Sequence, residues 1–248
     1  MTEWFEDESL WAALYPYMFS ERRFEIADEQ VQKALALTGS QAGVVLDLCC
    51  GPGRHAIALS KRGFRVIGVD RSLFLLGKAR EKARAARVET EFICEDMRRF
   101  LRPRAFDLIL NMFTSFGYFE DKKDDLKVLV NIHENLKPGG ACLIDVIGKE
   151  WLAKVFQPTA SSTEADGTIV IQRHEVLDDW TRLKNEWIMI KDGQARTLQF
   201  HHTVYSGQEL KDRMLAAGFS DVKLYGDLDG NSYGRNASRL IAVGRKSR

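Results

Sequence analysis

Short runs of apolar residues, rich in valine and isoleucine, alternate with longer stretches of helical character between residues 40 and 147. The runs contain few polar positions, which is typical of strands covered on both faces of a sheet. Strict alternation of strands and helices favours right-handed crossovers and a parallel sheet. Strands are expected within residues 44–48, 64–70, 88–96, 105–113 and 141–148, and helices within 55–63, 72–86 and 121–136. Residues 137–140, Lys-Pro-Gly-Gly, are expected to end the last of these helices and turn into the fifth strand.

After Ile147 the pattern changes to strand-like runs that follow one another without helical stretches between them. Three strands are expected, within residues 168–177, 182–190 and 195–206. Turns are expected at residues 178–179 and 191–194, and the Asp-Gly pair in the second turn is a good hairpin signal. This pattern indicates an antiparallel β-meander inserted into the α/β domain.

The two ends of the chain contribute further elements. A helix follows the meander, with Ser206 suited to its N-cap and Gly218 to its C-cap. Two last strands are expected within residues 221–228 and 239–246. The first 39 residues have the character of aromatic-rich helices joined by a turn at Pro16.

Together these elements predict an α/β fold with a doubly wound, mostly parallel, seven-stranded sheet and an inserted antiparallel meander. We divide the chain into an N-terminal helical segment (residues 1–39), a core (40–150 and 206–248) and an insertion over the active site (151–205).

The composition favours a soluble protein without a strongly charged partner. Its 248 residues carry 36 Lys and Arg against 35 Asp and Glu, so a net charge of +1 gives no pull toward nucleic acid or an anionic membrane. No apolar stretch approaches the roughly 20 residues that span a bilayer, and the acidic N-terminus is unlike a signal peptide. The four cysteines show no CxxC spacing. We therefore expect free thiols, no metal site and a cytoplasmic location.

Residues 44–56, VVLDLCCGPGRHA, place a glycine loop between the first strand and the first helix. GPGRHA fits the pattern G-x-G-x-x-G/A, in which a helix N-terminus holds a dinucleotide pyrophosphate. Asp47 argues against a diphosphate, because a carboxylate beside it is repelled. The acid suits a cationic ligand that carries a nucleoside, and S-adenosylmethionine has a sulfonium, an ammonium group and no phosphate. Alternatively, Asp47 caps the glycine turn without touching a ligand.

Further polar residues follow the next three strands. Asp70 ends the second strand and can accept hydrogen bonds from both hydroxyls of a ribose, in a dinucleotide or in S-adenosylmethionine. Glu95-Asp96-Met97 follows the third strand, where a carboxylate and a backbone N–H can meet an adenine ring. Residues 111–118 follow the fourth strand, at the carboxyl end of the sheet where ligands bind in open α/β folds.

In this order and spacing, LDLCCGPGRHA, VIGVD, EDMRRF, FDLILNMF and LKPGG resemble the motifs of class I S-adenosylmethionine-dependent methyltransferases. The resemblance covers roughly residues 40 to 147, and the last helix and strands resemble the closing reversed hairpin of the family. The meander resembles the lid of its small-molecule members. Cys49 departs from the pattern, since the family usually has glycine there.

The resemblance implies S-adenosylmethionine as cofactor, a small-molecule acceptor, no nucleic-acid or membrane partner, and a monomer or homodimer. In the N-terminal segment, Tyr15 would cover the cofactor and Arg22 or Arg23 would pair with its carboxylate. The candidate cofactor-binding residues are Tyr15, Arg22, Asp47, Cys49, Gly51, Gly53, Asp70, Arg71, Asp96, Met97, Asn111 and Phe113.

No catalytic residue stands out by spacing. In-line methyl transfer depends on alignment and on exclusion of water, and a hydroxyl acceptor also needs a base. His174 and His202 in the meander and Tyr118 after the fourth strand are the candidates, with a structural role open for each histidine. At most one of His201 and His202 faces a pocket, because side chains alternate along a strand.

Two other functions stay open at this point: a non-catalytic scaffold or regulator that binds S-adenosylmethionine, and an NAD(P)-dependent dehydrogenase. Arg98, Arg99, Arg102 and Arg104 form a small basic cluster, which we expect to be a solvated loop.

Overall fold

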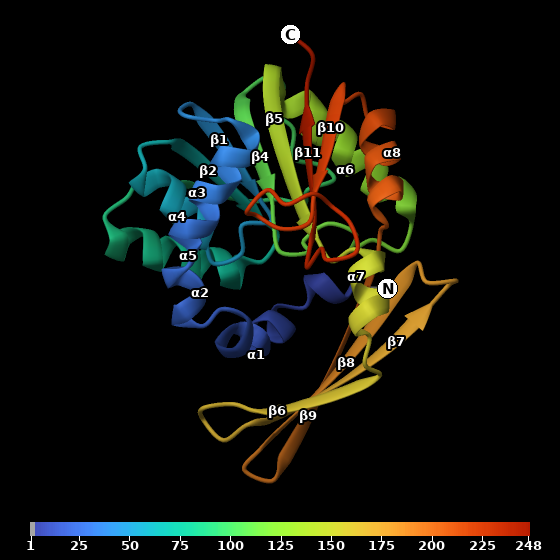
Figure 1. The fold of residues 1–248 in the computed structure, drawn as a ribbon. Coiled ribbons are helices and arrows are strands. Elements are labelled where there is room, and N and C mark those ends of the chain that lie inside the picture. Colours follow the sequence, from blue (N-terminus) through green and yellow to red (C-terminus); the bar gives the residue numbers. More distant parts are fainter. Residues whose placement is uncertain (1–2) are drawn as a thin grey trace.

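Seven strands form the central sheet of the computed structural model, which describes residues 3–248 (Figure 1). Their order is β10-β11-β5-β4-β1-β2-β3. β1 to β5 run parallel, whereas β11 is antiparallel to β5 and β10 is antiparallel to β11. The strands are β1 (Val44–Leu48), β2 (Arg65–Asp70), β3 (Glu91–Cys94), β4 (Phe106–Asn111), β5 (Leu136–Val146), β10 (Asp221–Tyr225) and β11 (Leu240–Arg245). The predicted, mostly parallel, seven-stranded sheet is confirmed.

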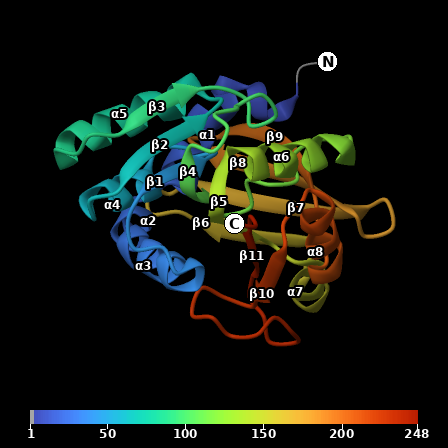
Figure 2. The same ribbon diagram turned by 90° about the horizontal axis from the view of Figure 1, so that it is seen from above.

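Helices cover both faces of this sheet (Figure 2). α3 and α4 pack on one face, and α6 and α8 pack on the other. Val45 and Leu46, consecutive in β1, belong to different apolar cores because successive side chains of a strand point to opposite faces. This double cover explains why the strands are nearly all apolar. The helices are α3 (Ala27–Thr38), α4 (Arg54–Lys61), α5 (Leu73–Ala86), α6 (Lys122–Asn135) and α8 (Gly207–Ala216).

A separate antiparallel sheet of four strands follows β5, in the order β6-β7-β8-β9. Its strands are β6 (Thr159–Thr163), β7 (Ile169–Leu177), β8 (Arg182–Lys191) and β9 (Gln194–Thr203). The predicted turns are where β7 meets β8 and β8 meets β9. The prediction of three strands is wrong by one, because β6 has the polar sequence TASST and an exposed edge position that leave no apolar alternation. The short helix α7 (Lys149–Val155) before β6 was also missed.

While α3 packs on a face of the central sheet, the first part of the N-terminal segment (residues 3–25) lies between the two sheets, at the carboxyl ends of the parallel strands (Figure 1). It comprises the 3₁₀ helix η1 (Trp4–Glu6), α1 (Glu8–Met18) and α2 (Glu21–Glu25). The turn predicted at Pro16 is wrong, since Pro16 lies inside α1, which ends at Met18 with Phe19 as its C-cap. A proline near the end of a helix removes only one backbone hydrogen bond. Within residues 3–248, no helix combines the length and the apolar character needed to cross a bilayer.

Two boundaries differ from the predictions by small amounts. Residues 137–140 lie inside β5, where pairing with β4 shifts register after Phe106, instead of forming a separate turn. Ser206 caps α8 as predicted and accepts a hydrogen bond from Glu209 N–H at 3.2 Å. Gly218, with a φ of 104°, follows the C-cap residue Ala217.

Candidate functional site

A cavity of about 580 Å³ lies at the carboxyl ends of β1 to β4. Its wall is built from the loops after these strands, the N-terminal segment, α7, and side chains of β7, β8 and β9. Small-molecule sites in proteins typically measure roughly 300–1,000 Å³. The position is also where open α/β sheets bind their ligands.

The glycine loop between β1 and α4 forms one end of the cavity. Three of its residues have left-handed backbone, with φ of 61° at Cys49, 54° at Gly51 and 79° at Gly53. Glycine adopts this conformation without strain, whereas Cys49 carries a side chain there. A Cβ on Gly53 would lie 3.0 Å from Ala79 Cβ and from Phe92 Cζ, so Gly53 permits close packing behind the loop. Cys49 and Gly51 line the cavity itself.

Asp47 is buried behind the glycine loop and is not part of the cavity wall. Ala56 N–H donates a hydrogen bond to its Oδ2 at 3.0 Å, which ties the end of β1 to the first turn of α4. Burial raises the pKa of Asp47 to about 7, so its negative charge is incomplete near neutral pH. This geometry favours the capping role that the sequence left open as the alternative.

Asp70 ends β2 and presents its carboxylate at the cavity wall. Gly51 N–H donates to Oδ2 at 2.7 Å, and Ser72 N–H donates to Oδ1 at 2.9 Å. Burial raises the pKa of Asp70 to about 6, although the N–H donors oppose this shift. Because a carboxylate has about four acceptor positions, Asp70 can hold these two loops and still accept hydrogen bonds from a ligand.

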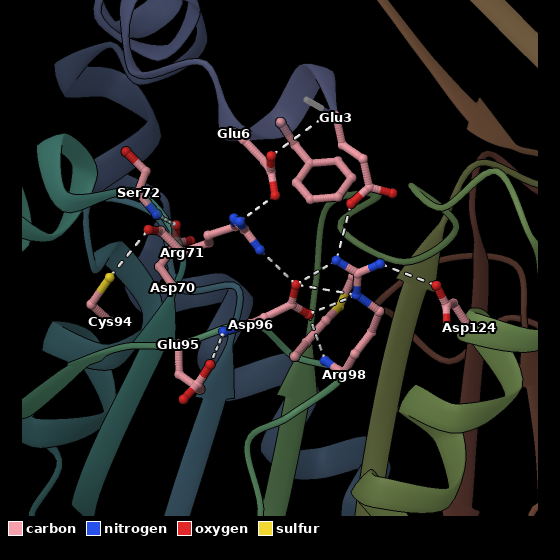
Figure 3. A network of polar contacts seen from close by, with 12 residues as sticks. Glu3, Glu6, Asp70, Arg71, Ser72, Cys94, Glu95, Asp96, Arg98 and Asp124 are labelled. Atoms are coloured by element: carbon pink, nitrogen blue, oxygen red, sulfur yellow. Dashed lines mark hydrogen bonds and ion pairs between the residues drawn. The ribbon is translucent and has the colours of Figure 1, made fainter. Parts of the chain in front are cut away.

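An ion-pair network centred on Asp96 joins the end of β3 to the N-terminal segment (Figure 3). Arg98 donates to both carboxylate oxygens of Asp96, at distances from 2.6 to 3.1 Å, and Arg71 donates at 2.7 Å. Glu3 accepts from Arg98 at 3.0 Å, and Glu6 pairs with Arg71. Burial acts to raise the pKa of Asp96, but its hydrogen bonds with Arg98 and the two positive charges lower it.

The network corrects the expectation of a solvated basic loop for Arg98, whereas Arg99 and Arg104 are exposed as expected. The Arg98 side chain is only 19% exposed and pairs with Asp124 at 3.1 Å, in addition to its two other carboxylate partners (Figure 3). Arg102 pairs with Glu91 on the surface. Local sequence could not reveal this network, because Glu3 and Glu6 are distant in the chain from their partners Arg98 and Arg71. Their contacts fix η1 so that its aromatic side chains line the cavity.

The residues directly after β4 form a strained segment at the cavity. Phe113 and Thr114 have φ of 59° and 63°. Phe113 N–H donates to Asp145 Oδ2 at 3.1 Å, and Thr114 N–H donates to the carbonyl of Asp145 at 2.8 Å. The Phe113 ring lies under Arg54, whose guanidinium carbon is 3.9 Å from the ring centroid. Such strain persists where the surroundings hold it, and it is concentrated at functional sites.

Side chains of β7, β8 and β9 form the other end of the cavity, which we call the meander face. His174 on β7 and Asn185 on β8 are cross-strand partners, and His174 Nδ1 lies 2.8 Å from Asn185 Oδ1. His202 on β9 is buried, and burial together with nearby Arg182 lowers its pKa to about 4, so it is neutral at pH 7. Tyr118 also lines the cavity.

Most of the predicted residues gather around this one cavity. Those that line it are Cys49, Gly51, Asp70, Arg71, Asp96, Met97, Phe113, Tyr118, His174 and His202. Those that do not are Tyr15, Arg22, Asp47, Gly53 and Asn111. His201 is likewise outside the lining, as strand alternation requires if His202 is inside it.

The residues outside the lining have structural contacts of their own. Tyr15 packs against Phe19 and Phe74. Asn111 Nδ2 donates to the carbonyl of Leu48 at 3.1 Å and so joins β4 to β1. Arg22 is exposed on α2, while its neighbour in the chain, Arg23, lines the cavity. Contact of these residues with a cofactor stays a prediction.

Sequence reasoning missed several lining residues, among them Arg54, Asn185, Trp187 and Arg239. Asn185 had a usable signal, because the predicted turn at residues 178–179 sets the hairpin register that brings it opposite His174. Arg239 had none. It reaches the cavity only because β11 inserts beside β5, which no local pattern reveals.

Comparison with known proteins places this geometry in a family. Residues 45–140 match the model of the methyltransferase domain. A candidate methyltransferase of Geobacillus sp. (strain WCH70) is 26% identical over 238 residues, which are 94% of this chain and 96% of the relative. A dTDP-3-amino-3,4,6-trideoxy-alpha-D-glucopyranose N,N-dimethyltransferase of Streptomyces venezuelae is 26% identical over 66% of this chain and 62% of its own.

Solved structures share the whole fold, including the second sheet. The CcbJ methyltransferase of Streptomyces caelestis superposes with a TM-score of 0.83 at 18% identity and covers 99% of both chains. An S-adenosylmethionine-dependent methyltransferase of Clostridium acetobutylicum ATCC 824 gives a TM-score of 0.81 at 17% identity, over 97% of this chain and 99% of that one. Residues 45–140 thus carry the methyltransferase domain, and the chain is an S-adenosylmethionine-dependent methyltransferase.

Proposed function

We propose that the protein transfers a methyl group to a nitrogen or oxygen atom of a small molecule by in-line displacement. The observation that carries this proposal is a single cavity that joins the glycine loop at one end to a face of aromatic and neutral polar side chains at the other. S-adenosylmethionine, when bound, supplies a methyl group that is already electrophilic. The protein must therefore mainly align the acceptor and exclude water.

The residues at the glycine-loop end fit this cofactor. A Cβ on Gly51 would meet only the Phe19 ring, at 3.5 Å, so the loop backbone is open to close approach by a ligand. Asp70 would accept hydrogen bonds from the ribose hydroxyls, and Asp96 with Met97 would border the adenine. Arg23, which lines the cavity, would pair with the carboxylate in place of Arg22.

The segments on either side of the cavity would exclude water. Trp11, Leu14 and Phe19 of the N-terminal segment line the cavity, which supports a role of this segment as the cofactor cover. Residues 151–205 supply the meander face, which supports their assignment as an insertion over the active site. The Streptomyces venezuelae relative is named for an amino-sugar nucleotide, which supports a small molecule as the acceptor class.

Two measurements test the proposal. Calorimetry should detect S-adenosylhomocysteine binding and no NAD binding at millimolar concentration. Transfer of label from methyl-labelled cofactor to a pool of small metabolites should then separate an enzyme from a protein that only binds the cofactor. Binding without transfer to any pool, or preference for NAD, would contradict the proposed function.

A further inference from the structure

The two ends of the cavity differ in charge. Within residues 3–248, its acidic lining residues are Asp70, Glu95 and Asp96, and all three lie at the ends of β2 and β3. The meander face presents imidazole, amide and indole groups instead. A buried cation without a carboxylate partner is costly. The meander face is therefore poorly suited to an acceptor that carries an ammonium group.

Three polar atoms of the meander face have no hydrogen-bond partner among the described residues: Asn185 Nδ2, Trp187 Nε1 and His202 Nε2. Asn185 is 4% exposed and His202 is 6% exposed, and all three side chains line the cavity. Because buried polar groups are nearly always satisfied, these atoms indicate partners on a ligand. The amide and indole N–H groups can only donate, so they call for a hydrogen-bond acceptor on that ligand, such as a hydroxyl oxygen.

The contact between His174 and Asn185 determines which imidazole nitrogen can take a proton. Asn185 Oδ1 is an acceptor and lies 2.8 Å from His174 Nδ1, so Nδ1 carries the hydrogen and Nε2 keeps its lone pair. A base oriented by a second polar group in this way is the arrangement found in acid–base catalysis. His174 lines the cavity but is only partly buried, so it can pass a proton on to water.

Resting on the methyl transfer proposed above, we propose that the acceptor is a phenol or a similarly acidic hydroxyl compound and that His174 removes its proton as the oxygen is methylated. Imidazoles ordinarily have a pKa of about 6.5 and phenols one of about 10, whereas water, as a model of an aliphatic hydroxyl, has about 15.7. The smaller gap makes removal of the proton easier from a phenol than from an aliphatic hydroxyl. Trp4, Trp187 and Phe200 line the cavity and supply aromatic surface for the ring.

His202 is suited to orienting the acceptor and not to removing the proton. Burial and the nearby Arg182 lower its pKa to about 4, so it is a weaker base than an ordinary imidazole. Thr203 N–H donates to Gly117 O at 2.6 Å, so this part of β9 is fastened to the loop that follows β4. His202 thus lies next to a residue that is bound to the loop after β4.

The reaction balances without a further reactant. The acceptor oxygen forms a bond to the methyl carbon while the carbon–sulfur bond breaks, and its electron pair stays on sulfur, which becomes a neutral thioether. The hydroxyl proton moves to His174 Nε2 and then to solvent.

The acceptor class is tested with the intact protein, S-adenosylmethionine and matched ring compounds: 1-naphthol, 1-naphthylamine, 1-(aminomethyl)naphthalene, catechol and cyclohexanol. Mass spectrometry should detect O-methylated naphthol or catechol, with kcat/KM at least about tenfold above that of the amines. Faster methylation of an amine, or methylation of none of the probes while S-adenosylhomocysteine still binds, would overturn the acceptor class. Loss of S-adenosylhomocysteine binding would instead overturn the proposed function.

The roles of His174 and Asn185 are tested in variants, with the phenol that the unaltered protein methylates with the highest kcat/KM as acceptor. His174→Gln should lower kcat by about 100-fold or more and leave the KM for the phenol within a few-fold. Asn185→Asp keeps an oxygen opposite Nδ1 and should retain most of kcat, whereas Asn185→Leu should lose it. His201→Gln, which changes a neighbour outside the cavity lining, is the matched control. Equal losses in Asn185→Asp and Asn185→Leu, or an unchanged kcat in His174→Gln, would refute the base assignment.

Discussion

Arg239 Nε donates to Asp145 Oδ1 at 2.6 Å, and this bond joins the residue directly before β11 to β5, beside the segment that follows β4. Arg239 also donates to Thr114 Oγ1 at 3.1 Å, while Asp145 accepts from the backbone of both Phe113 and Thr114. Asp145 is only 1% exposed. Two consecutive left-handed residues are thus held by one buried residue, Phe113 through the Asp145 carboxylate and Thr114 through the Asp145 main-chain carbonyl, and Arg239 balances the charge of that carboxylate.

Asp145→Asn should destabilise the protein by about 3 kcal/mol or more, because breaking a buried ion pair leaves Arg239 without its charge partner. The same change should reduce methyl transfer, since the Phe113–Thr114 segment lies on the cavity wall. Urea unfolding and a methyl-transfer assay measure the two effects. The control is Asp28→Asn, which removes an exposed pair with Arg62 and should cost no more than about 1 kcal/mol. Equal costs for the two variants would contradict the special role of Asp145.

Local patterns in the sequence predict the central sheet well, because each strand and helix there carries its own signal. The nearly continuous apolar run of β4 and the capping residue Ser206 are examples that a reader can find without the structure. The same holds for the glycine-loop end of the cavity, where the glycine loop, Asp70 and Met97 lie at or after the ends of strands whose order is predictable. Parallel topology alone brings such strand ends together.

The acceptor end could not be predicted in the same way. β6 is a polar edge strand that is held by pairing with β7 and buries little apolar surface. Its sequence therefore shows no apolar alternation. Arg239 and Glu6 act through partners that are distant in sequence, Asp145 and Arg71. Asp47 shows a different limit: its charge was weighed as if it faced the ligand, but burial and the bond from Ala56 direct it inward.

Cys49 offers a direct test of backbone strain at the glycine loop. A residue with a Cβ in the left-handed region costs about 1–2 kcal/mol relative to its preferred conformation, and glycine does not. Cys49→Gly should therefore be more stable than Cys49→Ala by about 1 kcal/mol, since both variants lose the contact between Cys49 Sγ and Met97 Sδ at 3.4 Å. Thermal unfolding of the two variants measures the difference. A more stable alanine variant would show that the φ of 61° at this position carries no strain.

Asp47 should make the protein less stable as the pH rises. Its folded-state pKa of about 7 lies above the ordinary carboxyl value of 3.8, so the folded protein binds a proton that the unfolded chain has released between these values. The protein therefore loses stability as the pH rises through that window. Above the window the total loss is about 4 kcal/mol. Asp47→Asn, which stays uncharged, should gain stability relative to the unaltered protein between about pH 4 and about pH 8. Urea unfolding of both proteins at several pH values measures this gain, and a constant difference would contradict it.

Asp70→Asn should weaken binding of S-adenosylhomocysteine by about 1.5–3 kcal/mol, because hydrogen bonds to a charged group are lost and one backbone N–H is left facing an amide. Binding to the unaltered protein should also weaken as the pH falls below about 6, where Asp70 takes up a proton. The control is Asp107→Asn, which removes a carboxylate paired with Lys137 at the amino end of β4 and should leave the affinity unchanged. Calorimetric titrations at about pH 5 and about pH 8 separate the two carboxylates. If Asp70→Asn and Asp107→Asn bind equally well, the ribose contact assigned to Asp70 does not exist.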